Sequence, residues 1–180
     1  MKKMNYSVVL ILLVSLGFVQ SDTWYLLEVP EFGFSIQFPG KPVKSMDPES
    51  QTAAYMYIYD ATKNGTDENL IYSATYAEYQ SMDTSTNITD FKQTDELFKK
   101  AIKGAVKSVN GKLLSENTIY LSGGIPGREI RIDFKHGLAI IKMRIYVVKN
   151  KMYLLQTITE TKKQYNLSVT RFMNSFQLLN

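Results

Sequence analysis

The chain has 180 residues, of which 44% are hydrophobic and 21% charged, with a formal net charge of +4. That length suits one ordinary domain, and the composition is that of a globular protein. Because the chain has no cysteine and only one histidine, His136, it excludes disulfides, thiol nucleophiles, iron–sulfur clusters and metal centres built from several histidines of one chain.

The first 21 residues have the pattern of a secretory signal peptide. Lys2 and Lys3 precede an apolar run over residues 8–19, and residues 19–21 (Val-Gln-Ser) fit the pattern before a cleavage site. The run is about 12 residues long, short of the ~20 that span a bilayer. We therefore predict an exported mature domain over residues 22–180, periplasmic or secreted. An uncleaved N-terminal anchor is the alternative.

Removal of that segment makes the charge nearly even. Without Lys2 and Lys3 the 21 basic residues become 19, against 17 acidic residues, so the net charge falls to +2. The sequence has no prominent Lys/Arg cluster, and such a balance does not favour nucleic acid as a partner. The acidic residues lack calcium-loop spacing, so we predict no metal and no cofactor.

Four strands are predicted before the first helix, because apolar and polar residues alternate along each of them. They cover residues 24–29, 33–38, 53–60 and 69–79. Asn64-Gly65, a strong hairpin signal, joins the last two strands. Residues 43–52 are polar and are predicted to form a connection.

Two amphipathic helices are predicted from apolar residues at three- and four-residue steps. The first contains Leu97, Phe98, Ala101, Ile102, Ala105, Val106 and Val109, and the second contains Tyr165, Val169, Phe172, Met173 and Phe176. Asp90 with Gln93 is a capping arrangement for the first helix, and Thr161 is the predicted N-cap of the second. Gly104 lies on the apolar side of the first helix, where glycine costs about 1 kcal/mol relative to alanine, so we expect a close approach to the sheet there.

The best-specified stretch lies between the two helices. A strand over residues 112–121 leads into residues 123–159, which we predict to form a three-stranded antiparallel meander. Its turns are Lys135-His136-Gly137 and Lys149-Asn150-Lys151. Short turns between consecutive strands favour an α+β fold: an antiparallel sheet of about six to eight strands with two packed helices, in a single domain.

Four short motifs, spread over most of the mature chain, carry a resemblance to a known family. They are Phe34-Ser35-Ile36-Gln37-Phe38-Pro39, Gly127-Arg128-Glu129, the hairpin from Tyr146 to Tyr153, and Phe172-Met173-Asn174-Ser175-Phe176. With these motifs the sequence resembles the PsbP-like superfamily, which includes PsbP and the exported DcrB-like proteins. The resemblance implies an antiparallel sheet with helices packed on it, used as a non-enzymatic binding or accessory module. No functional residue of PsbP is matched, so none is carried over.

Tyrosine is the unusual feature of the composition, with 12 residues. Tyr55, Tyr57 and Tyr59 share one face of their predicted strand, and Tyr72 and Tyr76 share one face of the next. If the registers agree, they form an aromatic strip with hydroxyls at its edge, as in many recognition surfaces. Packing under a helix, or the preference of strands for tyrosine, is the alternative.

Arg128 is the other candidate binding residue, either in a fixed ion pair with its neighbour Glu129 or as a solvated edge residue. The glycine-rich run over residues 123–127 opens a strand and not a helix, so it indicates a turn and not a phosphate-binding loop. His136 follows Asp133 by three residues, but the sequence has no nucleophile elbow that would complete a triad, so no catalytic residue is assigned.

The leading hypothesis is an exported, non-enzymatic binding or accessory protein of the cell envelope. Its partner would be a protein or an envelope component, bound at the tyrosine strip. The alternative is a secreted hydrolase that uses carboxylates such as Asp133 or Glu129, which requires an acidic pair to converge in a pocket. A third hypothesis is a purely structural envelope protein that associates with itself.

Overall fold

The computed structural model describes residues 24–46, 54–63, 67–78 and 91–179. The predicted signal peptide, the Asn64-Gly65 turn and the capping residue Asp90 lie outside these ranges. In the described part of the chain, no helix has the length and apolar composition needed to cross a membrane.

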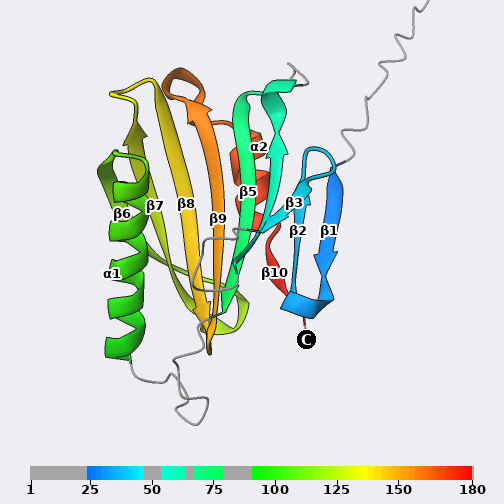
Figure 1. Ribbon diagram of the computed structural model, residues 1–180, viewed down its shortest axis with the longest axis vertical. Coiled ribbons are helices and arrows are strands. Elements are labelled where there is room, and N and C mark those ends of the chain that lie inside the picture. Colours follow the sequence, from blue (N-terminus) through cyan, green and yellow to red (C-terminus); the bar gives the residue numbers. More distant parts are fainter. Residues whose placement is uncertain (1–23, 47–53, 64–66, 79–90, 180) are drawn as a thin grey trace, which may run out of the picture.

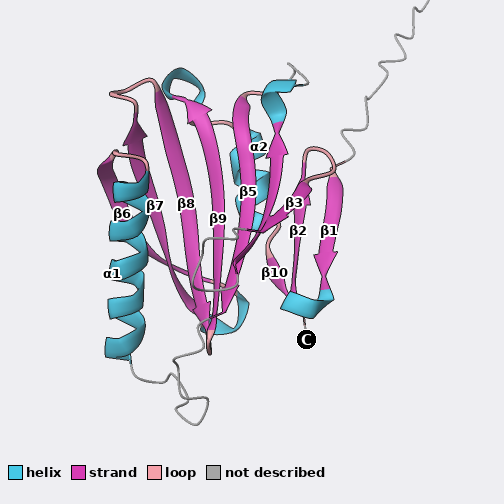
Figure 2. Ribbon diagram, in the orientation of Figure 1, coloured by secondary structure: helices cyan, strands magenta, loops and turns pink. Residues whose placement is uncertain are grey.

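In the described ranges, ten strands form two antiparallel sheets (Figures 1 and 2). The larger sheet has the order β3-β4-β5-β9-β8-β7-β6. Its strands are β3 (Val43–Met46), β4 (Ala54–Asp60), β5 (Asn69–Glu78), β6 (Lys112–Tyr120), β7 (Pro126–Phe134), β8 (Ala139–Val148) and β9 (Lys151–Glu160). The smaller sheet has the order β1-β2-β10, with β1 (Tyr25–Val29), β2 (Phe34–Phe38) and β10 (Gln177–Leu178). Antiparallel sheets with two helices confirm the predicted α+β class.

The two helices lie on opposite faces of the larger sheet (Figure 1). Helix α1 (Phe91–Ser108) packs through Phe98 and Ile102 on a mostly aliphatic face formed by β7, β8 and β9. We call this the aliphatic face; its buried sheet residues are Ile130, Ile132, Ile141, Met143, Ile145, Val147 and Met152.

Helix α2 (Leu167–Asn174) and the smaller sheet together cover the opposite face. We call it the aromatic face, because its buried sheet residues are mostly tyrosines: Tyr57, Tyr72, Ala74, Tyr76, Tyr146, Tyr153 and Leu155. The covering elements contribute phenylalanines, among them Phe34, Phe38 and Phe172. The second strand of the predicted meander is therefore buried on both sides, which explains why its apolar residues do not keep to one face.

The predicted meander is confirmed, with strands β7, β8 and β9 joined by short turns. In the first turn Lys135, His136 and Gly137 all have positive φ (52°, 55° and 87°), and the Gly137 backbone N–H donates to Asp133 Oδ1 at 2.6 Å. That hydrogen bond stabilises a left-handed turn which contains only one glycine.

Three local predictions are wrong. Residues 43–46, predicted as part of a polar connection, form the edge strand β3 against β4. Helix α2 starts after Asn166, whose side chain accepts from the Val169 N–H at 2.8 Å, and not after Thr161. A Cβ added at Gly104 would have nothing within 4 Å, so no close approach explains that glycine.

Candidate binding site

Four of the five tyrosines predicted to form a strip stand opposite one another in two cross-strand pairs. In the β4–β5 register Tyr55 pairs with Tyr76 and Tyr59 pairs with Tyr72, while Tyr57 lies opposite Ala74. The aromatic strip therefore exists, as cross-strand pairs on the aromatic face.

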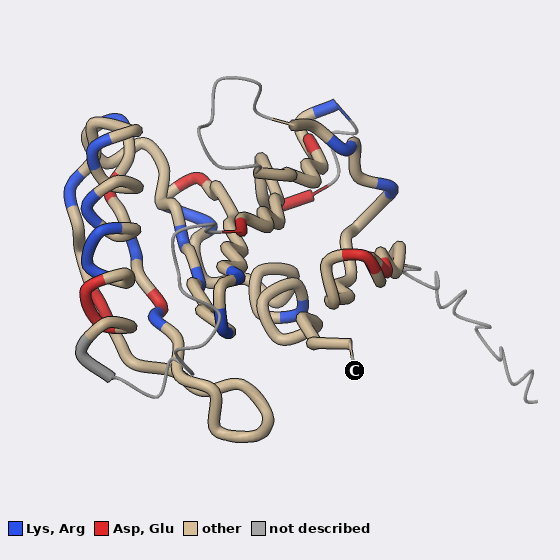
Figure 3. Tube along the Cα trace, turned by 60° about the horizontal axis from the view of Figure 1, so that its bottom comes forward, with Lys and Arg blue, Asp and Glu red and all other residues tan. Residues whose placement is uncertain are grey.

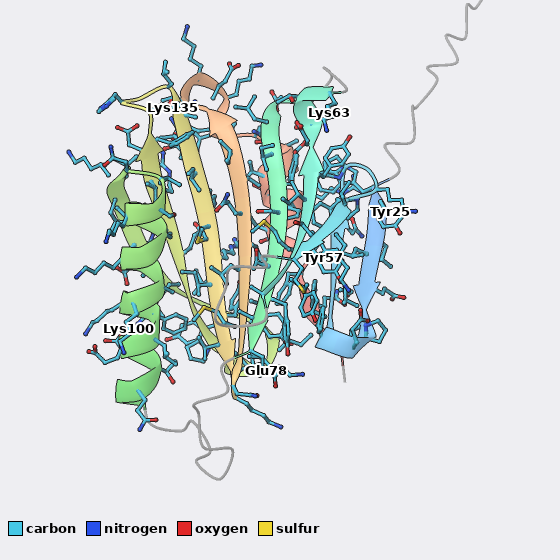
Figure 4. All side chains as sticks on the ribbon, viewed as in Figure 1. Tyr25, Tyr57, Lys63, Glu78, Lys100 and Lys135 are labelled. Atoms are coloured by element: carbon cyan, nitrogen blue, oxygen red, sulfur yellow. The ribbon has the colours of Figure 1, made fainter. Side chains whose placement is uncertain are left out.

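Three of these side chains are buried by the smaller sheet and α2. Tyr57, Tyr72 and Tyr76 are 5%, 0% and 3% exposed, and Tyr57 lies between the two sheets in Figure 4. Phe32 stacks on Tyr76 with ring centroids 4.3 Å apart. These three rings are core residues in this structure and present no surface to a partner. Only Tyr55 and Tyr59 are partly exposed, so binding at this strip stays a prediction for those two residues.

The buried hydroxyls have polar partners. Tyr72 donates to Asp67 Oδ1 at 2.8 Å and accepts from Asn69 Nδ2 at 2.6 Å. Burial raises the pKa of Tyr72, and the hydrogen bond to Asp67 raises it further. These hydrogen bonds offset the usual cost of burying a hydroxyl, so the buried tyrosines can be part of the core.

Arg128 does not pair with Glu129, because neighbouring strand residues point to opposite faces. Its guanidinium lies on the aliphatic side, 2.8 Å from Asp95 Oδ1 of α1 and 3.4 Å from Glu116 Oε1 of β6. It also stacks over Phe98, 4.8 Å from the ring centroid. With its side chain 16% exposed, Arg128 joins α1 to the sheet edge and is not a solvated edge residue.

The carboxylates of the hydrolase hypothesis do not converge. Glu129 and Asp133 are four residues apart on β7, roughly 13 Å along a strand. Burial alone would raise the pKa of Glu129, but the hydrogen bond from Arg144 and the charges of Lys142 and Arg144 hold it below its ordinary value. Asp133 accepts the turn N–H of Gly137, and His136 is exposed beside it.

A hollow of about 670 Å³ opens where the aromatic face reaches the end of α2. We call it the α2 pocket. Its lining comes from the β6–β7 connection, from β8, and from the α2–β10 segment: Tyr120, Leu121, Ser122, Ile125, Arg144, Tyr146, Met173, Asn174, Phe176, Gln177 and Leu178. Its size lies in the range typical of small-ligand sites.

Arg144 fixes one wall of the α2 pocket. Its Nε donates to Glu129 Oε2 at 2.7 Å, and its Nη1 donates to the Met173 carbonyl at 3.0 Å and to Asn174 Oδ1 at 2.9 Å. Because those acceptors lie at the C-terminal end of α2, the guanidinium also faces the negative end of the helix dipole. Arg144 therefore holds α2 against β8 and sets the position of this wall.

Tyr146 forms the floor of the pocket. Its ring is stacked on Phe176, with centroids 5.6 Å apart and planes 2° from parallel. The ring lies directly over Gly127, where an added Cβ would be 2.5 Å from Tyr146 Cδ1 and 2.8 Å from the Ile145 carbonyl oxygen. Gly127 thus gives the ring the room to lie flat on β7.

Sequence reasoning did not find the α2 pocket, because its lining comes from separate segments that only the tertiary fold brings together. One signal was available: Arg144 and Lys142 interrupt an otherwise apolar strand. Among the described residues there is no group of three or more histidines, cysteines or acids that could hold a metal ion.

Comparison with known proteins identifies the fold. No protein-family model matches the chain, and no curated protein matches its sequence. The structure is similar to the solution structure of cyanobacterial PsbP (CyanoP) from Synechocystis, with a TM-score of 0.61 and 12% identity over 92% of this chain and 98% of that one. It is also similar to PA94, a Pseudomonas aeruginosa protein of unknown function, over 78% of this chain and 85% of that one, with 11% identity and a TM-score of 0.42, too low to carry an argument. The fold is therefore PsbP-like, as the sequence motifs predicted.

Proposed function

We propose that this chain, which has the fold of cyanobacterial PsbP, is an exported, non-enzymatic binding or accessory protein of the cell envelope. Its partner, another protein or an envelope component, places a side chain or small group in the α2 pocket. The observation that carries the proposal is the pocket itself, with its fixed guanidinium wall and flat aromatic floor.

The chemistry of the lining supports binding. The pocket offers aromatic and aliphatic surface, one guanidinium, the side-chain amides of Asn174 and Gln177 and the hydroxyl of Ser122, and it has neither a carboxylate nor an imidazole. Such a set recognises a group by shape and hydrogen bonds and has no pair suited to general acid–base catalysis. Export is supported by the signal-peptide pattern of residues 1–21.

The position of Tyr120 makes the proposal testable without unfolding the domain. Its side chain lines the pocket and is 69% exposed, so truncating it removes contact surface and little core packing. We expect affinity capture from an envelope extract with the full chain to retain a partner that Tyr120→Ala loses. The matched control is Tyr25→Ala, because Tyr25 is a partly exposed tyrosine on edge strand β1. This variant should retain the partner.

Circular dichroism of the variants checks that folding is unchanged. Retention of the same partners by Tyr120→Ala would overturn the assignment of the α2 pocket. Export has a separate test: N-terminal sequencing of the protein recovered from exporting cells should start at Asp22, and recovery of a chain that retains residues 1–21 would contradict cleavage.

A further inference from the structure

Strand β6 is the long free edge of the larger sheet. It is the last strand in the sheet order and pairs only with β7, so one side of its backbone has no strand beside it among the described residues. The other edge, β3, has four residues, whereas β6 has nine. A register shift between Leu113 and Ser115 leaves Ser115–Tyr120 as the regular part of this edge. Such an edge can accept a further strand.

A groove of about 520 Å³ runs between this edge and α1. Residues of both elements line it, and the Asn110-Gly111 turn joins α1 to β6 (Figure 1). The floor of the groove is apolar, formed by Ile102 and Val106 of α1 and by Leu113 of β6, which is 37% exposed. A strand added to β6 would place alternate side chains over this floor.

The charge of the groove is positive. Lys99, Lys103 and Lys107 lie along its helical rim, and Figure 3 shows basic residues on successive turns of α1 with acidic residues near its N-terminal end. Lys99 is paired with Asp95 at 2.9 Å, and Glu116, the single acidic residue of the lining, is paired with Arg128 at 3.4 Å.

Two lysines of the rim are uncompensated. Lys103 and Lys107 are exposed and have no ion pair with any residue that the structure describes. A ligand that neutralises them needs negative charge at the spacing of one helical turn, beside apolar groups that fit the floor.

We propose that this groove binds an extended acidic segment of a partner protein, which adds to β6 as an eighth strand of the sheet. Backbone hydrogen bonds to β6 supply affinity, and side chains that alternate between the groove and solvent supply specificity. Groove-facing apolar side chains cover Ile102, Val106 and Leu113, while groove-facing carboxylates reach Lys103 and Lys107.

The probe is a short synthetic peptide in which threonine alternates with glutamate and leucine, titrated into the full chain at low and high salt. We expect saturable binding that weakens with salt, and amide resonances of Ser115–Tyr120 that shift and become protected from exchange. The double variant Lys103→Glu/Lys107→Glu should weaken binding by about tenfold or more. Lys41→Glu/Lys162→Glu, which makes the same change in net charge outside the groove, should bind as the unmodified chain does.

A second peptide separates strand addition from simple charge attraction. This peptide has the same side chains, but methyl groups replace the hydrogens on alternate backbone nitrogens, so it cannot donate the backbone hydrogen bonds to β6. We expect this change to abolish binding. Equal affinity for the methylated peptide, or no effect of the lysine variant, would overturn the proposal. A different result would be that the chain binds vesicles of anionic phospholipid, with the same dependence on Lys103 and Lys107, and fails to bind the peptide. That result would identify a membrane surface as the partner and would also overturn the proposal.

Discussion

The two faces of the larger sheet are closed by different chemistry. The aliphatic face buries isoleucines and methionines under one helix, and Arg128 joins that helix to the sheet edge. The aromatic face buries tyrosines under α2 and a second sheet, and its hydroxyls are hydrogen-bonded, as between Tyr153 and the Phe32 carbonyl at 2.9 Å. Aliphatic packing has no preferred direction, whereas rings and hydroxyls need fixed geometry. We therefore expect substitution or ionisation of side chains to destabilise the domain more on the aromatic face than on the aliphatic face.

The largest expected difference between the faces appears in alkali. Burial raises the pKa of five tyrosines of the aromatic face: Tyr57, Tyr72, Tyr76, Tyr146 and Tyr153. For Tyr153 the pKa rises from 10.0 to about 12. Because the folded state favours the neutral phenol, this stability is fully present below pH 10 and is lost as the pH rises through about 12.

We therefore expect the domain to unfold in that window, with tyrosinate absorbance from the buried rings rising together with the loss of circular dichroism. Ionisation of these tyrosines while the circular dichroism stays intact would show that the aromatic face opens locally, against this prediction.

Truncation of one ring should be the next largest effect. Tyr72→Ala removes a fully buried side chain, and we expect it to lower the free energy of unfolding by about 3–5 kcal/mol. Tyr72→Phe should cost about 1–2 kcal/mol, because Asp67 and Asn69 each lose a partner. Denaturant unfolding measures both values. Tyr25→Ala on the exposed edge is the control, and equal losses at the two positions would contradict the core assignment.

Gly127→Ala tests the fit of the pocket floor. The added methyl group would meet both the Tyr146 ring and the Ile145 carbonyl, so we expect a loss of about 1–3 kcal/mol in unfolding free energy. The stacking of Tyr146 on Phe176 should be disturbed as well, with a change in near-UV circular dichroism. A neutral substitution would mean that the ring is free to move away from β7.

Two arginines of β7 lie on opposite faces of the sheet, and each stacks on an aromatic ring. Arg128 stacks on the buried ring of Phe98, and Arg131 stacks at 5.3 Å on Tyr165, which is 82% exposed. We expect Arg128→Ala to lower the free energy of unfolding by about 1–2 kcal/mol, since its stacking is largely desolvated, and Arg131→Ala to lower it by less. Thermal unfolding of the two variants side by side decides this, and a larger loss for Arg131→Ala would refute the role given to Arg128.

The smallest predicted effect is an increase in stability. Gly104 is exposed in α1, and a Cβ there would touch nothing, so Gly104→Ala should raise the free energy of unfolding by about 1 kcal/mol. A loss at this position would indicate that α1 packs against something that the described residues do not include.

Much of the fold follows from the sequence, because alternation reports which strand residues are buried. The β7–β9 strands were predictable in this way, and so was the sharing of one face by the tyrosines of each of β4 and β5, whereas the register that pairs Tyr55 with Tyr76 was not. Strand β3 was missed because all four of its residues are exposed and show no alternation. Strand β10 was missed because it has two residues.

The covering of the tyrosines and the two hollows depend on tertiary structure. No local pattern places Phe32 over Tyr76, because the smaller sheet is assembled from segments far apart in the chain. The lysines of α1 do not stand out as a run in the sequence, and only helical spacing brings Lys99, Lys103 and Lys107 to one rim. The candidate sites were therefore less predictable than the strands.

The central position of β2 in the smaller sheet has a consequence for folding kinetics. Ser35 of β2 pairs with Gln177 of β10, so this contact closes a loop of roughly 140 residues, at an entropic cost of about 4 kcal/mol. The β7–β9 meander closes only short loops and should form in the folding transition state, whereas β2 and β10 should meet late. During synthesis the aromatic face cannot be completed before residues 177–178 are made, so the rings that β2 contributes wait for a segment roughly 140 residues further along the chain.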